Sequence, residues 1–310
     1  MANQFFDGSV MVPQTYIDNL DKAIELLWMR RDEFKGVLSQ FFTKVSTESL
    51  SYKTSSVSSV ADMPIQNEDT DALPYTVPAP GFDKTFTLVN YAMGIRVTST
   101  MVKADRFSKI VAQTGGLMKA SMRKLEHLRA DLIIGAFATT TTPDAAYLIS
   151  NSHLHENPEA GTYDNLTTGA LSYATLQGLR LLGMNMENEK GEPDDVILKT
   201  LLVPTALEQT ATELVLGGNG FVSENAIHQP ITLVKGVNVV VSPHLTDSDA
   251  WFGFGDLTGE NKGLLEMYLE EPNMGDNSPA DRRIVIDKSV KFIAKMGAIA
   301  AKNIYGSTGA

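Results

Sequence analysis

Two histidines and a neighbouring acid are the first residues whose types and spacing could support chemistry. His153 and His155, followed by Glu156, would place two imidazoles on one face of an extended segment, which is how a zinc site can begin. A zinc enzyme usually adds a third, distant ligand and a general base, as in a helical H-E-x-x-H motif, and that motif is absent from the sequence. We therefore predict no metal ligands in this chain.

Other chemical patterns in the chain are also incomplete. Residues 67–78 begin like a calcium-binding loop, but Ala72 and Pro78 replace the glycine and glutamate that such a loop needs. The glycines at 217–221 and 253–259 lack the lysine or the helix of phosphate-binding loops. A nucleophilic G-x-S-x-G motif is absent, and with no cysteine the chain has neither disulfides nor thiol chemistry. We predict no catalytic residue, no cofactor-binding residue, no cofactor and no enzyme activity.

The composition is typical of a globular protein with more acidic than basic residues. The 310 residues predict about two domains, and 43% hydrophobic with 20% charged residues is ordinary for a folded chain. The longest apolar run, residues 132–138, is far too short to cross a bilayer, and no signal peptide is evident, so we expect no membrane partner. A net charge of −11 disfavours a dedicated nucleic-acid binder.

Positive charge concentrates on one predicted helix. Apolar spacing predicts helices over residues 14–42 and 101–138, and we expect Gly115 and Gly116 to kink the second. Residues 101–138 carry a net charge of +4, which leaves −15 for the rest of the chain. A solvated helix face is the simpler interpretation, and a weak, salt-sensitive contact with nucleic-acid phosphates is the functional one. The basic residues that could share this face are Lys119, Arg123, Lys124 and Arg129.

A long hairpin is predicted before this helix. Residues 43–62 are rich in Ser and Thr, residues 83–100 alternate like a strand, and we interpret the two stretches as its arms. Residues 54–83 hold five acids and no Lys or Arg. An isolated hairpin is at best marginally stable in water, so this one must lie on its own domain or across a neighbouring subunit. We favour the neighbouring subunit.

The second half of the chain mixes helices and strands without regular βαβ spacing. Ser172 is a suitable N-cap for a helix over 173–186, and Pro204 suits the first turn of a second helix. The remaining apolar runs are predicted strands at 196–203, 237–241 and 251–254, with a strand pair over 284–301.

This order of elements, together with local motifs, resembles the major capsid protein of tailed bacteriophages. Residues 150–255 are similar to Mu-like head subunits. The shared motifs are a Tyr-Asp-Asn-Leu turn at 163–166, Ala-Leu-Ser at 170–172, Val203-Pro204 followed by Leu207-Glu208, and Pro243, Leu245 and Trp251.

The resemblance implies an α+β chain with the Hong Kong 97-type capsid fold. Its expected parts are an N-arm at 1–46, an extended E-loop hairpin at 47–98, a peripheral domain with a long spine helix at 99–171, a mixed α/β axial domain at 172–278, and peripheral return strands at 279–310. The implied function is a structural one. Copies of the chain would assemble as hexamers and pentamers into an icosahedral head around double-stranded DNA.

The resemblance also assigns candidate contact residues and partners. Tyr75, Phe82, Lys84 and Phe86 are the E-loop candidates for contact with a neighbouring subunit, and the four basic helix residues become candidates for facing DNA. In the capsid protein that gives the Hong Kong 97-type fold its name, the prototype, the E-loop carries a lysine-to-asparagine crosslink. Lys84 lies in the corresponding loop here, but no partner asparagine is identifiable, and we predict no crosslink.

The prototype's long cleaved leader segment has no counterpart here, so a separate scaffolding protein is expected. A portal is expected as well, and decoration or cement proteins are an open addition. Assembly in the host cytoplasm would place the chain in the virion head. Two alternatives remain at this stage: the shell of an encapsulin-type cellular compartment, and a soluble α/β enzyme with an unrecognised site.

Overall fold

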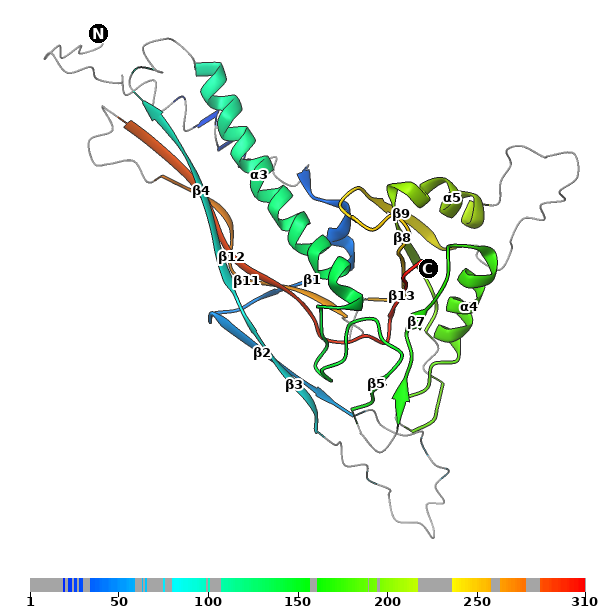
Figure 1. The fold of residues 1–310 in the computed structure, drawn as a ribbon. Coiled ribbons are helices and arrows are strands. Elements are labelled where there is room, and N and C mark those ends of the chain that lie inside the picture. Colours follow the sequence, from blue (N-terminus) through cyan, green and yellow to red (C-terminus); the bar gives the residue numbers. More distant parts are fainter. Residues whose placement is uncertain are drawn as a thin grey trace, which may run out of the picture.

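One long helix and two unequal β-sheets organise the chain in the computed structural model (Figure 1). The helices whose bounds lie in the described residues are α3 (Phe107–Ile134), α4 (Tyr173–Met184) and α5 (Glu208–Leu216), with short 3-10 helices η2 (Val37–Phe41), η3 (Gly135–Phe137) and η5 (Thr205–Leu207). The structure describes residues 34–58, 80–98, 107–156, 161–188, 190–193, 196–216, 236–257, 263–276 and 285–309, together with separate positions at 19–29, 63, 65, 75 and 100.

Thirteen strands complete the described elements. They are β1 (Thr43–Ser46), β2 (Ser51–Val57), β3 (Pro80–Thr87), β4 (Val89–Thr98), β5 (His153–Leu154), β6 (Thr162–Tyr163), β7 (Leu166–Thr167), β8 (Thr200–Pro204), β9 (Asn238–Ser242), β10 (Trp251–Phe254), β11 (Leu264–Asp276), β12 (Val285–Ala298) and β13 (Ile304–Ser307).

The first sheet has the strand order β1-β11-β12-β4 and lies along α3 (Figure 1). Side chains alternate between the two faces of a strand. Glu266 and Tyr268 of β11 therefore share the face toward α3 with Phe292 of β12, whereas Leu265 and Met267 point to the opposite face. This sheet is covered by α3 on one side and by the base of the β2–β3 hairpin on the other.

The second sheet has the order β7-β13-β10-β8-β9, and its central strands are buried on both faces. Leu201 and Trp251 pack in a cluster with α4 and α5. Their chain neighbours Leu202 and Phe252 belong to the larger core, which also includes α3 and the first sheet. That larger core therefore joins the two sheets into one body.

The predicted hairpin is real but shorter than expected. Ser51 pairs with Thr87, and the antiparallel register continues to the Val57–Pro80 pair. The parts of the two predicted arms that lie farthest from the hairpin tip belong to the first sheet instead, because β1 pairs with β11 and β4 pairs with β12. Most of the hairpin tip, residues 59–79, lies outside the described residues.

The expected kink at Gly115 and Gly116 is wrong, because α3 is helical without interruption from Phe107 to Ile134. Thr114, Leu117 and Met118 around the glycine pair are buried. Each glycine in a helix interior costs about 1 kcal/mol of helix stability relative to alanine. Tertiary packing of the buried side chains outweighs this cost.

Several local predictions are confirmed. The hydroxyl of Ser172 accepts a hydrogen bond from the Thr175 amide and caps α4 in a reciprocal capping box. Strands β8, β9 and β10 lie at the predicted apolar runs. Pro204, predicted in the first turn of the second helix, is instead the last residue of β8 and the extended N-cap of η5. The N-terminal helix predicted over 14–42 is helical at described positions between 19 and 29. It ends before the 3-10 helix at Val37–Phe41.

The predicted strand pair over 284–301 is wrong, since β12 is one strand of 14 residues. Its partner is β11, which the sequence analysis did not find. Through this pairing β11 and β4 lie in one sheet beside α3, although the predicted division places β11 in the axial domain and β4 in the E-loop. The domain bounds stay a prediction. Strand β13, assigned to the peripheral return, pairs in the second sheet. Among the described helices, none is long and apolar enough to span a membrane.

Candidate assembly surfaces

A buried ionic network fixes the end of the N-arm to the long helix. The amide of Leu38 donates to Glu126 Oε1 at 2.8 Å. Glu126 Oε2 accepts from Arg129 Nη1 at 3.1 Å, one helical turn along α3. The guanidinium of Arg129 also reaches Glu266 Oε2 on β11, at 2.7 Å from Nη2. Three segments that are far apart in the sequence therefore meet at one helical position.

This network shifts the pKa of two of its members, Arg129 and Tyr268. Burial opposes the charged form of Arg129, but the adjacent Glu266 carboxylate outweighs it and raises the pKa of the guanidinium. Burial, followed by the charge of Glu266, raises the pKa of Tyr268. Tyr268 donates its hydroxyl to Glu266 Oε2 at 2.8 Å. Arg129 is 4% exposed and committed to two carboxylates, so its prediction as a DNA-facing residue is wrong.

Close approach of the backbone makes this anchor possible. A Cβ atom added at Gly36 would lie 2.0 Å from the Glu126 carboxylate, a distance that no side chain tolerates. Glycine leaves room for the carboxylate to reach the amide of Leu38. The sequence analysis missed this anchor. Its one local signal is the i,i+3 spacing of Glu126 and Arg129, which is equally common in exposed helix pairs.

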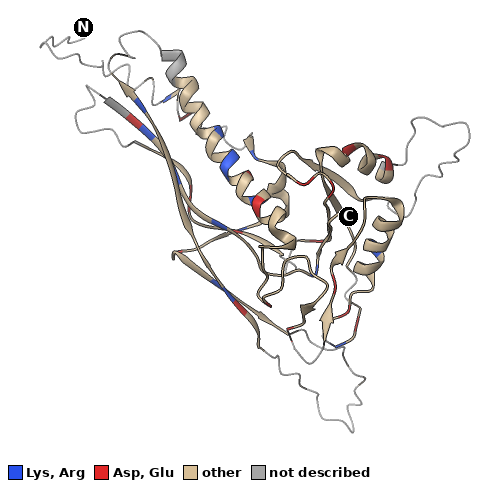
Figure 2. Ribbon diagram, viewed as in Figure 1, with Lys and Arg blue, Asp and Glu red and all other residues tan. Residues whose placement is uncertain are grey.

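Lys119, Arg123 and Lys124 are exposed on α3, as a surface role requires. Figure 2 marks the Lys and Arg positions along the helix in blue. They do not all share one environment. The ammonium of Lys119 lies 4.9 Å from the ring centre of Phe34 in the N-arm, and that of Lys124 lies 5.4 Å from the ring of Tyr91 in β4. Their contact with DNA stays a prediction.

The base of the hairpin packs on its own chain. Phe86 is 6% exposed and contacts Leu265 and Met267 on the face of the first sheet that points away from α3. A Cβ at Gly297 would lie 2.4 Å from the Phe86 ring, so the ring sits directly on the backbone of β12. Phe86 therefore has no surface left for a neighbouring subunit, and its prediction as an inter-subunit residue is wrong.

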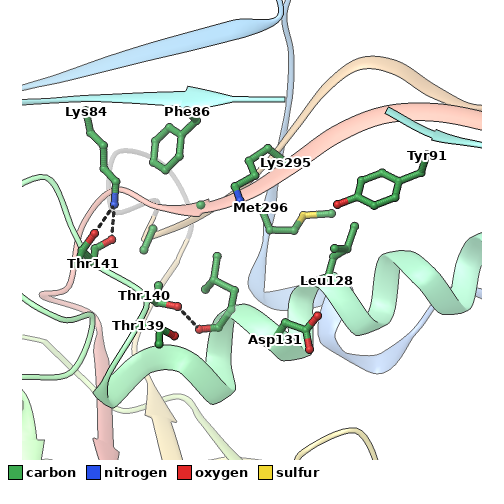
Figure 3. Close-up of a pocket in the computed structure, with 13 residues that line it drawn as sticks. Lys84, Phe86, Tyr91, Leu128, Asp131, Thr139, Thr140, Thr141, Lys295 and Met296 are labelled. Carbon is green, nitrogen blue, oxygen red and sulfur yellow. Dashed lines mark hydrogen bonds between the residues drawn. The ribbon is translucent and has the colours of Figure 1, made fainter. Parts of the chain in front are cut away.

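Lys84 also contacts its own chain. Its ammonium donates to the Thr141 carbonyl oxygen and, at 3.3 Å, to Thr141 Oγ1 in the loop that follows α3 (Figure 3). Burial, together with the positive charge of Lys295, lowers the pKa of Lys84 despite the opposing effect of Asp144. The lysine therefore fastens the hairpin to the body of the molecule.

The other two E-loop candidates differ in exposure. Tyr75 is 84% exposed, in a stretch where most neighbouring residues lie outside the described part. Phe82 is half-buried, and its amide donates to Ser56 Oγ across the hairpin at 2.9 Å. Their contact with a neighbouring subunit stays a prediction, best supported for Tyr75.

His153 has a structural environment. It is fully buried and stacked on Tyr163, and its Nδ1 lies 2.8 Å from Asp144 Oδ2. Asp144 also accepts from the Thr142 hydroxyl and from the amide of Leu154, so this carboxylate organises the loop after α3. Within the described part of the chain, no group of three or more potential ligands could hold a metal ion.

Two sheets, a long helix with an anchored N-terminal segment and a projecting hairpin are thus in place. A family model of phage capsid proteins matches residues 82–303. This chain belongs to the phage capsid protein family. The match to the capsid family begins within β3 and extends to the turn before β13, so it includes α3 and most strands of both sheets but neither β1 nor β13. A comparison with curated protein sequences gives no match.

Solved structures give the fold of this capsid protein. The cyanophage Pam1 capsid is similar with a TM-score of 0.53 and 11% identity, covering 88% of this chain and 91% of that chain. The mature capsid of bacteriophage PhiM1 gives 0.52 and 13%, covering 87% and 86%. A virus-like particle from Pyrococcus furiosus gives 0.50 and 10%, covering 93% and 98%. The capsid protein has the Hong Kong 97-type fold, as its sequence motifs predicted.

Proposed function

We propose that this capsid protein is the shell subunit of a tailed-phage head, assembling as hexamers and pentamers into an icosahedral container for double-stranded DNA. Membership of the phage capsid family supports a structural role in a virion shell. A scaffolding protein and a portal are the further partners that we propose, with decoration or cement proteins as an open addition. We place assembly in the host cytoplasm.

The observation that carries the proposal is the exposure of apolar side chains along the hairpin. Val57 is 61% exposed, Met63 96% and Ile65 fully exposed, and Tyr75 follows at 84%. Exposed apolar groups gathered on one projecting feature indicate an interaction surface, because covering them releases about 25 cal/mol per Å². A neighbouring copy is the surface that a shell supplies.

The first test is assembly of the purified chain, alone and with genes adjacent to its own. Size-exclusion chromatography and negative-stain microscopy should show closed shells. A variant lacking residues 62–79, with a short Gly-Ser linker joining β2 to β3, should keep its thermal unfolding midpoint and form no shells. Shells of normal size from this deletion variant would contradict the proposed role of the hairpin. A persistent wild-type monomer would contradict the shell function itself.

Contact with DNA is the second part of the proposal. Exposed Lys119, Arg123 and Lys124 are the residues that would touch phosphates. Each lost phosphate contact lowers the slope of log affinity against log salt by about 0.9. Changing all three to Gln should therefore reduce both DNA retention in shells and its salt dependence.

A matched control removes equal charge elsewhere. Lys190, Lys199 and Lys291 are exposed, and Lys291 lies on the face of β12 that points away from α3. Changing these three to Gln should leave the salt dependence of DNA retention unchanged. Equal effects of the two triple variants would show that only net charge matters and would contradict a DNA-facing α3.

An encapsulin-type cellular compartment that would enclose protein cargo is the second candidate, because the same fold occurs in a virus-like particle from Pyrococcus furiosus, with 98% of that chain covered. The contents of shells assembled in cells distinguish the two. Nuclease-protected DNA of uniform length supports the phage head, whereas a single co-purifying enzyme without nucleic acid supports the compartment.

A further inference from the structure

A pocket opens beside β12 at the point where β4 ends. Strand β4 pairs with β12 only as far as the Val89–Ala294 pair, while β12 continues to Ala298 with β11 as its partner on the other side. Strand β3 pairs with β2 and does not replace β4. The resulting hairpin-base pocket measures about 390 Å³ and lies between β3, the last turns of α3, the loop after α3 and residues 295–298 (Figure 3).

The edge of β12 that borders this pocket offers main-chain donors. In an antiparallel ladder, successive residues direct their N–H and C=O groups alternately to the strand on one side and to the strand on the other. Residues 295–298 pair with β11 in unbroken register, so every second amide among them points to the edge that β4 has left. None of the described strands pairs with that edge. Its N–H groups therefore face the pocket.

Two lysines add positive charge to the same side of the pocket (Figure 3). The ammonium of Lys84 donates to the carbonyl and hydroxyl oxygens of Thr141, and its third N–H group remains for a ligand. Lys295 forms no ion pair with another described residue. Burial is the main cause that lowers the pKa of Lys84, and the charge of Lys295 adds to it. An anion between the two lysines would relieve their repulsion.

The described carboxylates leave this side of the pocket without a counter-ion. Asp144 acts on Lys84 from outside the pocket, and both of its oxygens already take part in hydrogen bonds within the loop after α3. Asp131 lines the opposite end, near Tyr91 (Figure 3). There, after burial, its charge is the second cause that raises the pKa of the Tyr91 hydroxyl.

We propose that the hairpin-base pocket binds a phosphate dianion, either free or carried as a monoester by a small organic molecule. Its donors come from three elements: Lys84 on β3, the Thr141 hydroxyl in the loop after α3, and Lys295 with the open amides of β12. Donors on several sides suit a tetrahedral anion with several acceptor oxygens better than a planar carboxylate with two.

The size of the pocket leaves space for an organic group. Its volume of about 390 Å³ lies within the range of small-molecule sites, and Met296 and Tyr91 line the part away from Lys84. A bound phosphate would touch the hairpin and the body together and so hold the base of the hairpin in place. All of these groups belong to one chain, so the inference does not depend on the proposed shell function.

Isothermal titration calorimetry of the purified chain tests the site. Inorganic phosphate, glycerol phosphate and a nucleoside monophosphate are titrated separately at constant ionic strength. Saturable binding of inorganic phosphate would show that the free anion suffices, and saturable binding of an organic phosphate alone would assign the site to the monoester. The absence of saturable binding in all three titrations would overturn the proposal.

Single substitutions locate the binding. Lys295→Gln changes an exposed side chain that takes no part in the bonds between Lys84 and Thr141. Because hydrogen bonds to charged groups are the stronger ones, this change should weaken phosphate binding about tenfold or more. Lys84→Gln should weaken it in the same direction. The control Lys291→Gln removes an equal charge from β12 outside the pocket and should bind like the wild type.

Thermal unfolding separates lost binding from lost folding, because each variant without ligand serves as its own reference. Phosphate should raise the unfolding midpoint of the wild type and of Lys291→Gln by mass action, and should raise that of Lys295→Gln much less. An equal rise in all three chains would overturn the assignment to this pocket. A rise of the same size from sodium chloride at equal ionic strength would show an adventitious ion only and would also overturn it.

Discussion

The five-stranded sheet and the β2–β3 hairpin use strands in opposite ways. All residues of β10 and β13 are buried, and the two faces of that sheet belong to two different cores. Strand β2 instead alternates exposed and half-buried residues, and among the described hairpin residues only Tyr52 and Phe86 share a hydrophobic cluster with the body. The sheet supplies stability to one chain, whereas the hairpin presents surface that a single chain leaves uncovered.

Composition explains the contrast. Strand β10 reads Trp-Phe-Gly-Phe, so every side chain except glycine gains from burial. Strand β2 reads Ser-Tyr-Lys-Thr-Ser-Ser-Val, and its polar side chains gain nothing from an apolar surrounding. Mutations in the two regions should therefore affect different measurements: unfolding for the sheet and assembly for the hairpin.

The largest effect on stability is expected at Trp251. Its side chain is fully buried and its indole Nε1 donates to the Gly169 carbonyl oxygen at 3.2 Å. Trp251→Ala should lower the free energy of unfolding by about 3–5 kcal/mol, measured by urea denaturation of the unassembled chain. Tyr173→Ala, on the exposed side of α4, is the control and should cost under about 0.5 kcal/mol. Similar losses at both positions would remove the distinction between buried sheet and surface.

Glu126 lies between the two extremes, where the N-arm meets α3. Glu126→Gln would leave Arg129 with one carboxylate instead of two, and removing one partner of a buried ion pair costs about 3 kcal/mol. Urea denaturation should show this loss, while exposed Glu187→Gln should be neutral. Gly36→Ala should imitate the loss by displacing the carboxylate. If Glu126→Gln unfolds like the wild type, the network does not anchor the N-arm.

Asp144 should give a smaller, pH-dependent effect. Burial opposes its charged form, but hydrogen bonds from His153 and Thr142 outweigh it and lower the pKa of the carboxyl. A lowered pKa means that the folded state binds the proton less readily, so this stabilisation is complete above the ordinary aspartate value of about 3.9 and is lost as pH falls below it. Asp144→Asn should flatten the acid limb of the stability curve. An unchanged acid limb would contradict this role of the loop.

The smallest effect is expected in the hairpin itself. Lys53 and Asp83 form a cross-strand ion pair at 2.7 Å with both side chains more than half exposed. Water and salt screen such a pair, so Lys53→Gln should change the unfolding free energy by less than about 0.5 kcal/mol. A loss near that of Glu126→Gln would show that the hairpin contributes to the fold of the single chain.

Local features could be predicted from the sequence because their causes are local. The cap at Ser172 needs only the residue three positions later, and the buried strand at Trp251 is a short apolar run between turns. The capsid family could also be predicted, from motifs between residues 150 and 255. The hairpin was found from its alternation, but its length was overestimated, because strands that alternate alike can pair with several partners.

The tertiary structure decided the remaining features because they depend on distant residues. Strand β4 has the pattern of a hairpin arm, yet Arg96 pairs with Asp287, 191 residues away, in a strand that the sequence alone does not connect to it. Arg129 follows the exposed lysines of α3 at helical spacing, which predicts that it is exposed as well. Its ion pair with Glu266, 137 residues away, instead holds it in the buried network that anchors the N-arm. Sequence determines which side chains can be buried or charged; the fold determines which distant partner satisfies each one.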